Sequence, residues 1–254
     1  MAYVMKSLQF KEKLIQALNG KSLYVLGAFG APATASNKNR YSTNCSYNKD
    51  RAKMIQSATA DTFFFDCAGL IKGILWGWNA NTSKVYGGAV YKSNGVPDTG
   101  NLIGYCSNVS SDFTKIQPME MVYMEGHVGV YIGYGQVIEC SPKWENKVQI
   151  TMLGNLPQYK TGNYRIWLKH GFLPWIDYSD QKETAPVEPK AEDAPKLITN
   201  PIEYYTVQKG DSLSKIANKF KTNVNQLVLW NKKKYPTLAI NKNLILKGWT
   251  LRVK

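Results

Sequence analysis

The chain has 254 residues and a formal net charge of +14 at neutral pH. Its length suffices for one substantial domain and a smaller second one. No apolar run reaches the roughly 18 residues that a membrane span requires, so we expect no membrane insertion. The N-terminal residues lack the charged region and uninterrupted apolar core of a secretory signal. This predicts a protein that stays in the cytoplasm where it is made, or leaves by a route that needs no signal.

The positive charge is concentrated at the C-terminal end. Residues 1–178 carry 18 basic and 11 acidic side chains, residues 179–203 carry 3 and 6, and residues 204–254 carry 11 and 1. A tail this basic predicts an acidic polymer as partner, either nucleic acid or a teichoic-acid-decorated cell wall. The sequence has no recognition-helix or RNA-motif signature, so we expect no nucleic-acid partner.

The first sixty residues predict one helix and one long polar excursion. Apolar side chains recur at helical spacing over residues 5–18, and Asn19-Gly20 ends that helix. Residues 24–27 predict a short strand or turn. Residues 31–61 are rich in Ser, Thr, Asn and Lys, and long excursions from a compact domain are often functional.

A short stretch around Cys67 carries the strongest chemical signal. Three phenylalanines precede Asp66 and Cys67, and apolar residues at helical spacing follow. Asp66 is a favourable N-cap, so Cys67 should occupy the first turn of a helix. There the helix dipole and the unpaired backbone N–H groups are expected to lower the pKa of the thiol. The alternative is a small apolar cysteine buried in a core.

The remaining cysteines do not indicate a metal site. Cys45, Cys106 and Cys140 form no C-x-x-C pair, and the chain has only two histidines. We therefore expect no metal and no cofactor. In a chain of this size without a signal, free thiols are favoured over disulfides.

The middle of the chain predicts a strand-rich half-domain. Residues 133–135 fit a hairpin turn between strands 127–133 and 136–140, and residues 148–152 and 164–168 predict two further strands. The first of these strands alternates, which puts two sets of side chains on opposite faces: Val128, Val130 and Ile132 on one, and His127, Gly129 and Tyr131 on the other.

Two histidines compete for the role of general base. A thiolate nucleophile needs a base within hydrogen-bond reach and a third group that holds the tautomer of that base. His127 is favoured, because its strand setting fixes the side chain and its ring could face a helix packed on the sheet. His170 sits in a basic turn after the last strand. Glu139, on the returning hairpin strand, could accept the imidazole N–H and favour a thiolate–imidazolium pair. The alternatives are a structural histidine and a solvent-facing carboxylate.

These residues together resemble the NlpC-type (NlpC/p-sixty) peptidoglycan cysteine peptidases. The resemblance rests on Asp66-Cys67-Ala68-Gly69-Leu70, on the stretch 126–135 and on Glu139, and it covers residues 1–178. It implies an α+β, papain-like catalytic domain in which Cys67 attacks a peptide carbonyl, His127 is the base and Glu139 orients it. It also implies an oxyanion site at the Cys67 backbone N–H.

The family resemblance leaves the cleaved bond open. It implies cleavage between D-glutamate and the following diamino acid, but many members hold histidine or another polar residue where Glu139 stands. Glutamate at that position is also similar to the CHAP amidases and peptidases. Ala68 replaces the serine that is common after the nucleophile. Tyr24 is a candidate for the family's substrate-side tyrosine, although residues 31–61 separate it from Cys67.

The C-terminal quarter predicts a linker and a small domain. Residues 179–203 are polar, charged and Pro-rich, which is typical of a flexible linker. Residues 204–254 predict a strand, two short helices and a returning strand over 240–253. The segments 205–217, 227–231 and 243–251 are similar to LysM modules.

The LysM resemblance implies a βααβ domain that binds N-acetylglucosamine-containing glycans. Its two binding loops would consist of Gly210, Asp211, Ser212 and Leu213, facing Ile245, Leu246 and Lys247. Lys247 stands where proline is frequent. The many lysines are either a solvated face or a surface that attracts anionic wall polymers.

Together these features predict a peptidoglycan hydrolase held at its substrate by a wall-binding module. The preferred reaction is that of a γ-D-glutamyl-diamino acid endopeptidase. The alternatives are an N-acetylmuramoyl-L-alanine amidase of the same fold and a non-enzymatic glycan-binding protein. Without a signal, the best fit is a bacteriophage endolysin that acts from the host cytoplasm after a holin-type protein opens the membrane.

Overall fold

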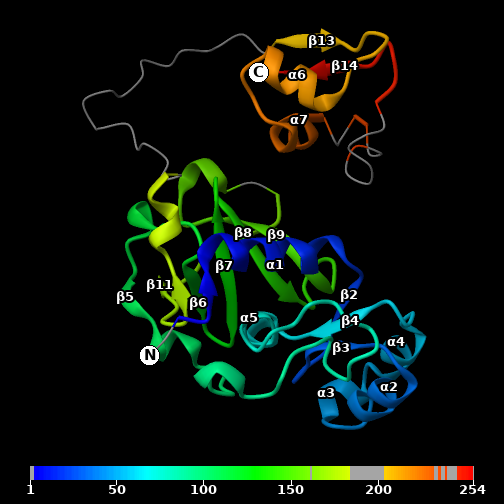
Figure 1. Cartoon of the computed structure of the whole chain (residues 1–254), viewed down its shortest axis with the longest axis vertical. Coiled ribbons are helices and arrows are strands. Elements are labelled where there is room, and N and C mark those ends of the chain that lie inside the picture. The colour runs from blue at the N-terminus through cyan, green and yellow to red at the C-terminus, as the bar shows by residue number, and fades with distance from the viewer. Residues whose placement is uncertain are drawn as a thin grey trace. The chain divides into compact units, whose positions relative to one another are not determined.

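The computed structural model describes residues 3–160, 162–183, 203–231, 234–235, 238 and 245–253. The chain divides into two compact units, Met1–Pro186 and Val187–Lys254, and each is described by itself. Figure 1 shows the N-terminal unit as a sheet with helices packed against it and the C-terminal unit as a small domain of strands and helices.

The N-terminal unit is built on a seven-stranded sheet that curls as a half-barrel. Its strand order is β10-β9-β8-β7-β6-β11-β5, and the strands from β6 to β9 pair as successive antiparallel hairpins. The predicted turn between β7 and β8 is confirmed, with positive φ at Tyr134 and Gly135, as a two-residue hairpin turn requires. The strands are β5 (Ser107–Ser110), β6 (Met121–Met124), β7 (His127–Gly133), β8 (Gln136–Ser141), β9 (Lys147–Leu153), β10 (Tyr164–Arg165) and β11 (Lys169–Phe172).

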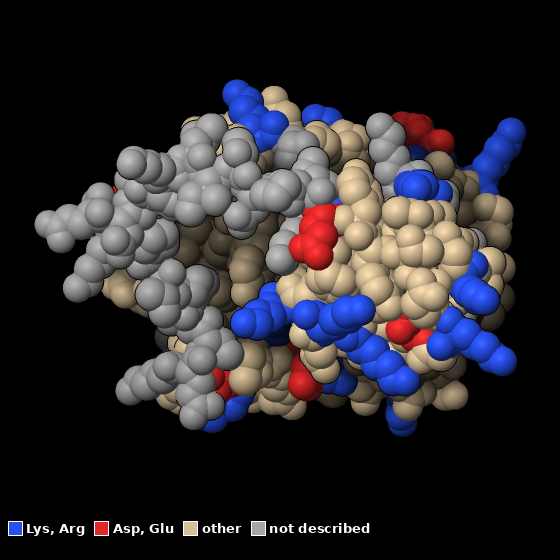
Figure 2. Space-filling model, turned by 90° about the horizontal axis from the view of Figure 1, so that it is seen from above, with Lys and Arg blue, Asp and Glu red and all other residues tan. Residues whose placement is uncertain are grey.

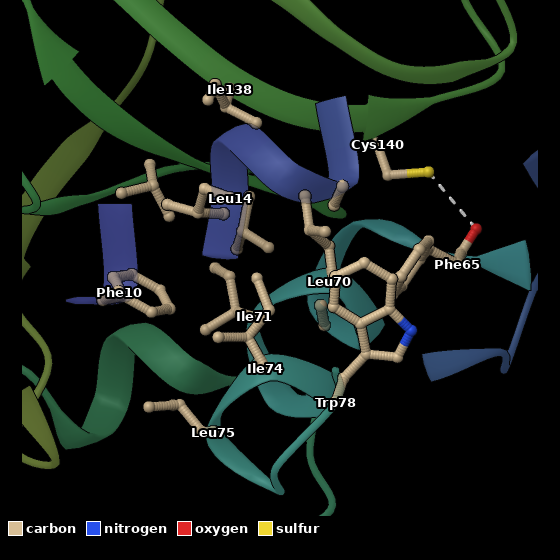
Figure 3. Packing of buried hydrophobic residues seen from close by; sticks show 14 of the residues in the cluster. Phe10, Leu14, Phe65, Leu70, Ile71, Ile74, Leu75, Trp78, Ile138 and Cys140 are labelled. Carbon is tan, nitrogen blue, oxygen red and sulfur yellow. Dashed lines mark hydrogen bonds between the residues drawn. The ribbon is translucent and has the colours of Figure 1, made fainter. Parts of the chain in front are cut away.

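One face of this sheet carries the main hydrophobic core. Helices α1 (Ser7–Asn19) and α5 (Cys67–Leu75) contribute to it, and Figure 3 shows their apolar side chains meeting Ile138 of β8. The predicted alternation of β7 is confirmed, since Val128, Val130 and Ile132 share a face and all belong to this cluster. Helix α1 begins two residues later than predicted, because β1 (Met5–Lys6) pairs with β12 (Ile176–Asp177).

A second, three-stranded sheet determines where α5 begins. It consists of β2 (Ser22–Tyr24), β4 (Phe63–Phe65) and β3 (Phe29–Pro32), and β4 leads directly into α5. A Cβ at Gly69 of α5 would lie 1.9 Å from the carbonyl oxygen of Ala28. Only glycine allows the helix to approach the neighbouring backbone this closely.

Residues 31–61, predicted as a polar excursion, are packed. Three short helices close a second core around Tyr41, Ile55 and Phe64. Further short 3₁₀ helices lie in the loops of the unit. The α-helices are α2 (Ala35–Tyr41), α3 (Ser46–Lys49) and α4 (Ala52–Ser57), and the 3₁₀ helices are Ser93–Gly95, Leu102–Tyr105, Phe113–Lys115, Pro157–Tyr159 and Ser179–Glu183.

The strand predicted over residues 164–168 is wrong beyond its second residue. The backbone N–H and carbonyl of Trp167 both bond to the side chain of Asn155, at 2.8 Å each. Because this side chain takes the place of a strand partner, β10 stops at Arg165. The chain re-enters the sheet as β11, between β6 and β5.

The start of the predicted linker belongs to the N-terminal unit. Ser179–Glu183 forms a 3₁₀ helix in which Asp180 accepts hydrogen bonds from the Ser7 hydroxyl and from the Leu8 N–H, the latter at 3.0 Å. These bonds tie the helix to the first turn of α1, so the segment is not a free linker. Residues 184–202 of the predicted linker lie outside the described residues.

The C-terminal unit has the predicted βααβ order. Strand β13 (Tyr204–Thr206) pairs antiparallel with β14 (Thr250–Arg252), and α6 (Leu213–Lys219) and α7 (Val224–Asn231) lie between them in the chain. Asn231 joins α7 to β14, because its side chain donates to the Arg252 carbonyl at 2.9 Å and accepts from the Arg252 N–H at 2.7 Å. Of the predicted return strand, residues 250–252 are a strand, and residues 240–244 lie outside the described residues.

Candidate functional site

Cys67 is the first residue of α5, as predicted. Asp66 is the N-cap, and its carboxylate accepts hydrogen bonds from the Gly69 N–H and, at 2.7 Å, from the Gly27 N–H. The second bond anchors the cap to the loop that follows β2. Cys67 is partly exposed at the end of the helix, so an external molecule can reach it.

The prediction of a lowered thiol pKa is wrong. Burial raises the pKa of the Cys67 thiol to about 11, and the charge of Asp66 acts in the same direction. The backbone N–H groups of Val128, Ala68 and Cys67 itself act towards a lower pKa, but they do not outweigh the loss of hydration. At neutral pH Cys67 is therefore a thiol, and it would need a base to become a thiolate.

A backbone contact joins the Cys67 helix to the strand of the predicted base. The N–H of Val128, the residue after His127, acts towards a lower pKa of the Cys67 thiol. Helix α5 packs against β7, the strand that begins with His127. The fold therefore places the helix of Cys67 against the strand of His127.

A second contact joins the strand of Glu139 to the residues before Cys67. The thiol of Cys140 donates to the carbonyl oxygen of Phe65 at 3.3 Å, as Figure 3 shows. Cys140 follows Glu139 on β8, and Phe65 is the last residue of β4. Cys140 has no exposed surface, and burial raises its pKa well above the ordinary value. It acts as a structural thiol that holds the two sheets together.

His127 and Glu139 form a direct pair. Nε2 of His127 hydrogen-bonds to Oε2 of Glu139. The Glu139 side chain has no exposed surface, whereas the His127 side chain keeps 12% of its surface exposed. The alternative of a solvent-facing carboxylate is therefore wrong. Within the described part of the chain, Nδ1 of His127 has no hydrogen-bond partner, which leaves this nitrogen available to a nucleophile.

The imidazole of His127 does not lie on the sheet face that α5 covers. It stacks on Trp167 with ring centroids 5.7 Å apart and an interplanar angle of 15°. Trp167 belongs to the cluster on the opposite face, which includes Tyr131 and Val137. The expectation that the ring faces the helix is wrong, because alternation puts His127 and Val128 on opposite faces. It is the opposite face of β7, which carries Val128, that packs against α5.

Arg165 completes the pair and was not predicted as a site residue. Its Nε donates to both carboxylate oxygens of Glu139, at 2.9 and 2.7 Å, and its Nη2 donates to the Ser141 hydroxyl at 2.7 Å. Burial acts to raise the pKa of Glu139, but His127 and Arg165 outweigh it, and the pKa is lowered from its ordinary value. The only sequence signal for Arg165 was its place in a predicted strand.

Tyr24 lies close to Cys67 in the second sheet. Strand β2 is parallel to β4 and pairs Tyr24 with Phe65, two residues before Cys67. Burial raises the pKa of Tyr24, and the neighbouring Cys67 and Asp66 charges add to the effect. No described residue hydrogen-bonds to its hydroxyl. Residues 31–61 do not prevent this placement, because they leave β3 and return to β4 within the same sheet.

His170 is placed in a different environment from the predicted basic turn. It is a buried residue of β11, with Nδ1 bonded to Glu120 and Nε2 3.1 Å from the carbonyl oxygen of Asp112. Burial raises the pKa of Glu120, although the bond to His170 opposes the rise. Because both ring nitrogens are occupied, His170 cannot accept a proton from a thiol.

In the described ranges, no group of three or more His, Cys, Asp or Glu side chains is arranged to hold a metal ion. The cysteines Cys45, Cys67, Cys106 and Cys140 are free thiols. The searched residues also contain no helix of the length and hydropathy needed to cross a bilayer.

The first predicted glycan-binding loop is rigid. Gly210 has a positive φ of 87°, and Asp211 accepts hydrogen bonds from the Gln208 N–H at 2.7 Å and the Tyr205 hydroxyl at 2.9 Å. Ser212 caps α6. The side chain of Leu213 lies in the core with 3% exposure, and the role of Leu213 in glycan binding stays a prediction.

The second predicted loop lies beside the first. The N–H of Gly248 donates to the Val207 carbonyl at 2.9 Å, and the Val207 N–H donates to the Trp249 carbonyl at 2.8 Å. Val207 leads into the loop at Gly210, so these two bonds bring the predicted loops together. Leu246 is 52% exposed, Lys247 is exposed, and Ile245 packs on the core.

Residues 205–247 match the LysM domain family. The C-terminal unit contains a LysM domain. Domains of this family bind peptidoglycan and chitin-type glycans that contain N-acetylglucosamine, which supports a glycan-binding role for the two loops. The match does not extend to the N-terminal unit, whose resemblance to the NlpC-type peptidases stays a prediction. No curated protein matches the chain.

The surface around the LysM core is basic. Asp211 is the one acidic residue among positions 204–254, and its carboxylate is used within its own loop. Figure 2 shows basic side chains at many separate places on the visible face and a few acidic ones among them. Little negative charge is therefore available there to neutralise the lysines.

Proposed function

We propose that this chain is a peptidoglycan hydrolase that cleaves wall peptides with a Cys67–His127–Glu139 mechanism. The observation that carries the proposal is the pair of His127 with a fully buried Glu139, beside a thiol on the first turn of α5. A buried carboxylate that holds one imidazole nitrogen and leaves the other unbonded is the arrangement a general base requires.

In the proposed reaction, Nδ1 of His127 removes the proton of Cys67 as the sulfur attacks the peptide carbonyl carbon. The negative charge moves to the carbonyl oxygen, which the Cys67 backbone N–H can stabilise at the start of α5. The imidazolium then gives its proton to the leaving amine as the C–N bond breaks, and a thioester remains. Water, activated by the same imidazole, hydrolyses the thioester and restores the thiol.

The raised thiol pKa fits this order of events. Because the resting group is a thiol, proton transfer to His127 accompanies attack instead of preceding it. Glu139 holds Nε2 and stabilises the imidazolium that forms. Tyr24, with its unpaired hydroxyl next to Cys67, is suited to contact the substrate on the nucleophile side.

The LysM domain would keep the catalytic unit at its insoluble substrate. Tethering of this kind raises the local enzyme concentration without any new contact in the active site. The surplus of lysines adds attraction to anionic wall polymers, an effect that weakens as salt increases. Action from a host cytoplasm after membrane opening, as in a phage endolysin, stays a prediction.

The test is mass spectrometry of the fragments released from purified peptidoglycan by the wild type and by Cys67→Ser. New amino termini on a diamino acid, absent with the variant, would establish the endopeptidase. Released L-alanine termini with free lactyl ends on the sugar would establish the amidase instead.

The non-enzymatic alternative gives a different result in the same experiment. If walls from several bacterial hosts bind the protein but neither form releases a fragment, the chain is a glycan-binding protein and Cys67 is structural. Release that is equal for wild type and Cys67→Ser would rule out Cys67 as the nucleophile.

A further inference from the structure

We infer that Arg165 is a positioning residue of the proposed reaction: it fixes Glu139 and balances its charge, which leaves His127 free to accept the Cys67 proton near neutral pH. The inference rests on the proposed function. It adds a fourth side chain to the site, one that acts only through Glu139.

The geometry ties Arg165 to one orientation of the carboxylate. Its Nε reaches both oxygens of Glu139, and its Nη2 is held by Ser141, which lies two residues further along β8. The guanidinium is therefore bonded to two side chains on the same face of the same strand. A planar group held at two points allows little rotation of the carboxylate.

The charge argument follows from the burial of Glu139. A carboxylate with no exposed surface needs a positive partner, and without Arg165 the one described side chain left to supply it is His127. His127 would then retain a second ring proton and could not act as a base. Arg165 is charged at every accessible pH, so it supplies the positive partner without a proton from the imidazole.

The other ionisable groups around the site do not duplicate this role. Cys67 and Asp66 lie at the start of α5, and Cys67 is uncharged at neutral pH. Glu125 lies in the exposed turn between β6 and β7 and accepts a hydrogen bond from the Tyr123 hydroxyl. Among the described residues, Arg165 of β10 is the one Lys or Arg side chain bonded to Glu139.

Trp144 shields the Arg165 guanidinium from water. The centroid of its ring lies 4.8 Å from Cζ of Arg165 and 4.5 Å from Nζ of Lys143. Trp144 has a positive φ of 68°, which is strained for a bulky residue. Gln149 supports this turn by donating to the Lys143 carbonyl at 2.8 Å.

The experiment follows the protonation of His127 by NMR in full-length protein labelled with 15N-histidine. The chain has only two histidines, and His170, bonded to Glu120 away from Arg165, reports whether the fold is intact. The parent is Cys67→Ala, which removes coupled titration with the thiol. Arg165→Met and Arg165→Lys are compared in that parent.

We expect Arg165→Met to move the His127 titration midpoint upward by about one pH unit or more, and Arg165→Lys to return it towards the parent. The His170 signals should not change. A midpoint that stays in place or moves down in Arg165→Met overturns the inference. If the His170 signals show that Arg165→Met is misfolded, Arg165→Gln gives the same uncharged comparison with a donor retained.

Hydrolysis measured in parallel separates the two proposals. In protein that retains Cys67, Arg165→Met should shift the acid side of the kcat/KM profile to higher pH and lower activity about tenfold on that side, the factor of a one-unit shift. Arg165→Lys should recover part of the lost activity. No hydrolysis by the wild type refutes the proposed function while the NMR comparison still tests Arg165. Normal hydrolysis with an unmoved midpoint refutes the inference alone.

Discussion

The imidazole of His127 is hydrogen-bonded to Glu139, which lies on the next strand with no exposed side-chain surface. Gly129 leaves room for this arrangement, because a Cβ there would lie 2.7 Å from Cγ1 of Val137 and 3.2 Å from the Trp167 ring that supports the imidazole. A side chain at position 129 would therefore force Val137 to shift and would crowd Trp167. The local geometry of two strands thus fixes the orientation of the His127 imidazole.

The first prediction concerns thiol reactivity. Because burial raises the pKa of Cys67 to about 11, alkylation of Cys67 by iodoacetamide should increase steadily from pH 6 to pH 9 without a plateau. Peptide mapping separates this thiol from Cys45 and Cys106, which serve as internal controls. A plateau at pH 6–7 would instead indicate a preformed thiolate–imidazolium pair and contradict the thiol resting state.

The second prediction concerns Glu139 and pH. Its pKa is lowered in the folded protein, so its stabilising contribution is present above the unfolded pKa and is lost as pH falls through the folded value. Urea unfolding of wild type and Glu139→Gln should differ most near pH 7, and the difference should shrink below about pH 4.5. A difference that is constant from pH 7 to pH 3 would show that the carboxylate charge contributes nothing.

The same Glu139→Gln variant should lose about 10²–10⁴-fold in kcat, because the amide holds the imidazole poorly and cannot stabilise an imidazolium. Binding to intact walls should be unchanged, since the LysM domain is untouched. Activity within twofold of the wild type would remove Glu139 from the mechanism.

The third prediction separates the two histidines. His170→Ala leaves the buried Glu120 without its imidazole partner, so the free energy of unfolding should fall by about 3 kcal/mol, measured by urea titration at pH 7. Hydrolysis per folded molecule should be retained, because His170 does not contact Cys67. His127→Ala is the matched control and should show the reverse pattern. Loss of hydrolysis in folded His170→Ala would count against the assignment of the base.

The fourth prediction concerns Tyr24. Its hydroxyl has no hydrogen-bond partner in the part of the chain that the structure describes, so Tyr24→Phe should leave the melting temperature nearly unchanged. If the hydroxyl contacts substrate beside Cys67, kcat/KM should fall about tenfold, the value of one hydrogen bond. An unchanged kcat/KM on muropeptides would exclude that contact.

The fifth prediction concerns wall binding. Leu246 is 52% exposed on the second LysM loop, so Leu246→Asp should preserve the fold and weaken co-sedimentation with insoluble peptidoglycan. Leu229, 42% exposed on α7, provides the control variant Leu229→Asp, which should bind normally. Hydrolysis of small soluble muropeptides should be equal in both variants. Equal loss of binding in both would indicate a charge effect and not a glycan contact.

The sequence by itself determined the elements that depend on neighbouring residues. The Asp66 cap, the position of Cys67 on the first turn, the alternation of β7 and the βααβ order all follow from short-range chemistry. These features need only a residue's own backbone preference and its neighbours within one turn or hairpin. The pairing of His127 with Glu139 could be predicted for the same reason, since one hairpin joins the two residues.

The tertiary structure decided the chemical state of the site. Whether the thiol pKa rises or falls depends on how much water packing removes, and burial outweighed the helix terminus at Cys67. Arg165 reaches Glu139 from 26 residues away, and Tyr24 reaches Cys67 across an inserted set of helices. Long-range contacts and desolvation have no local pattern in the sequence, so only the folded chain could reveal them.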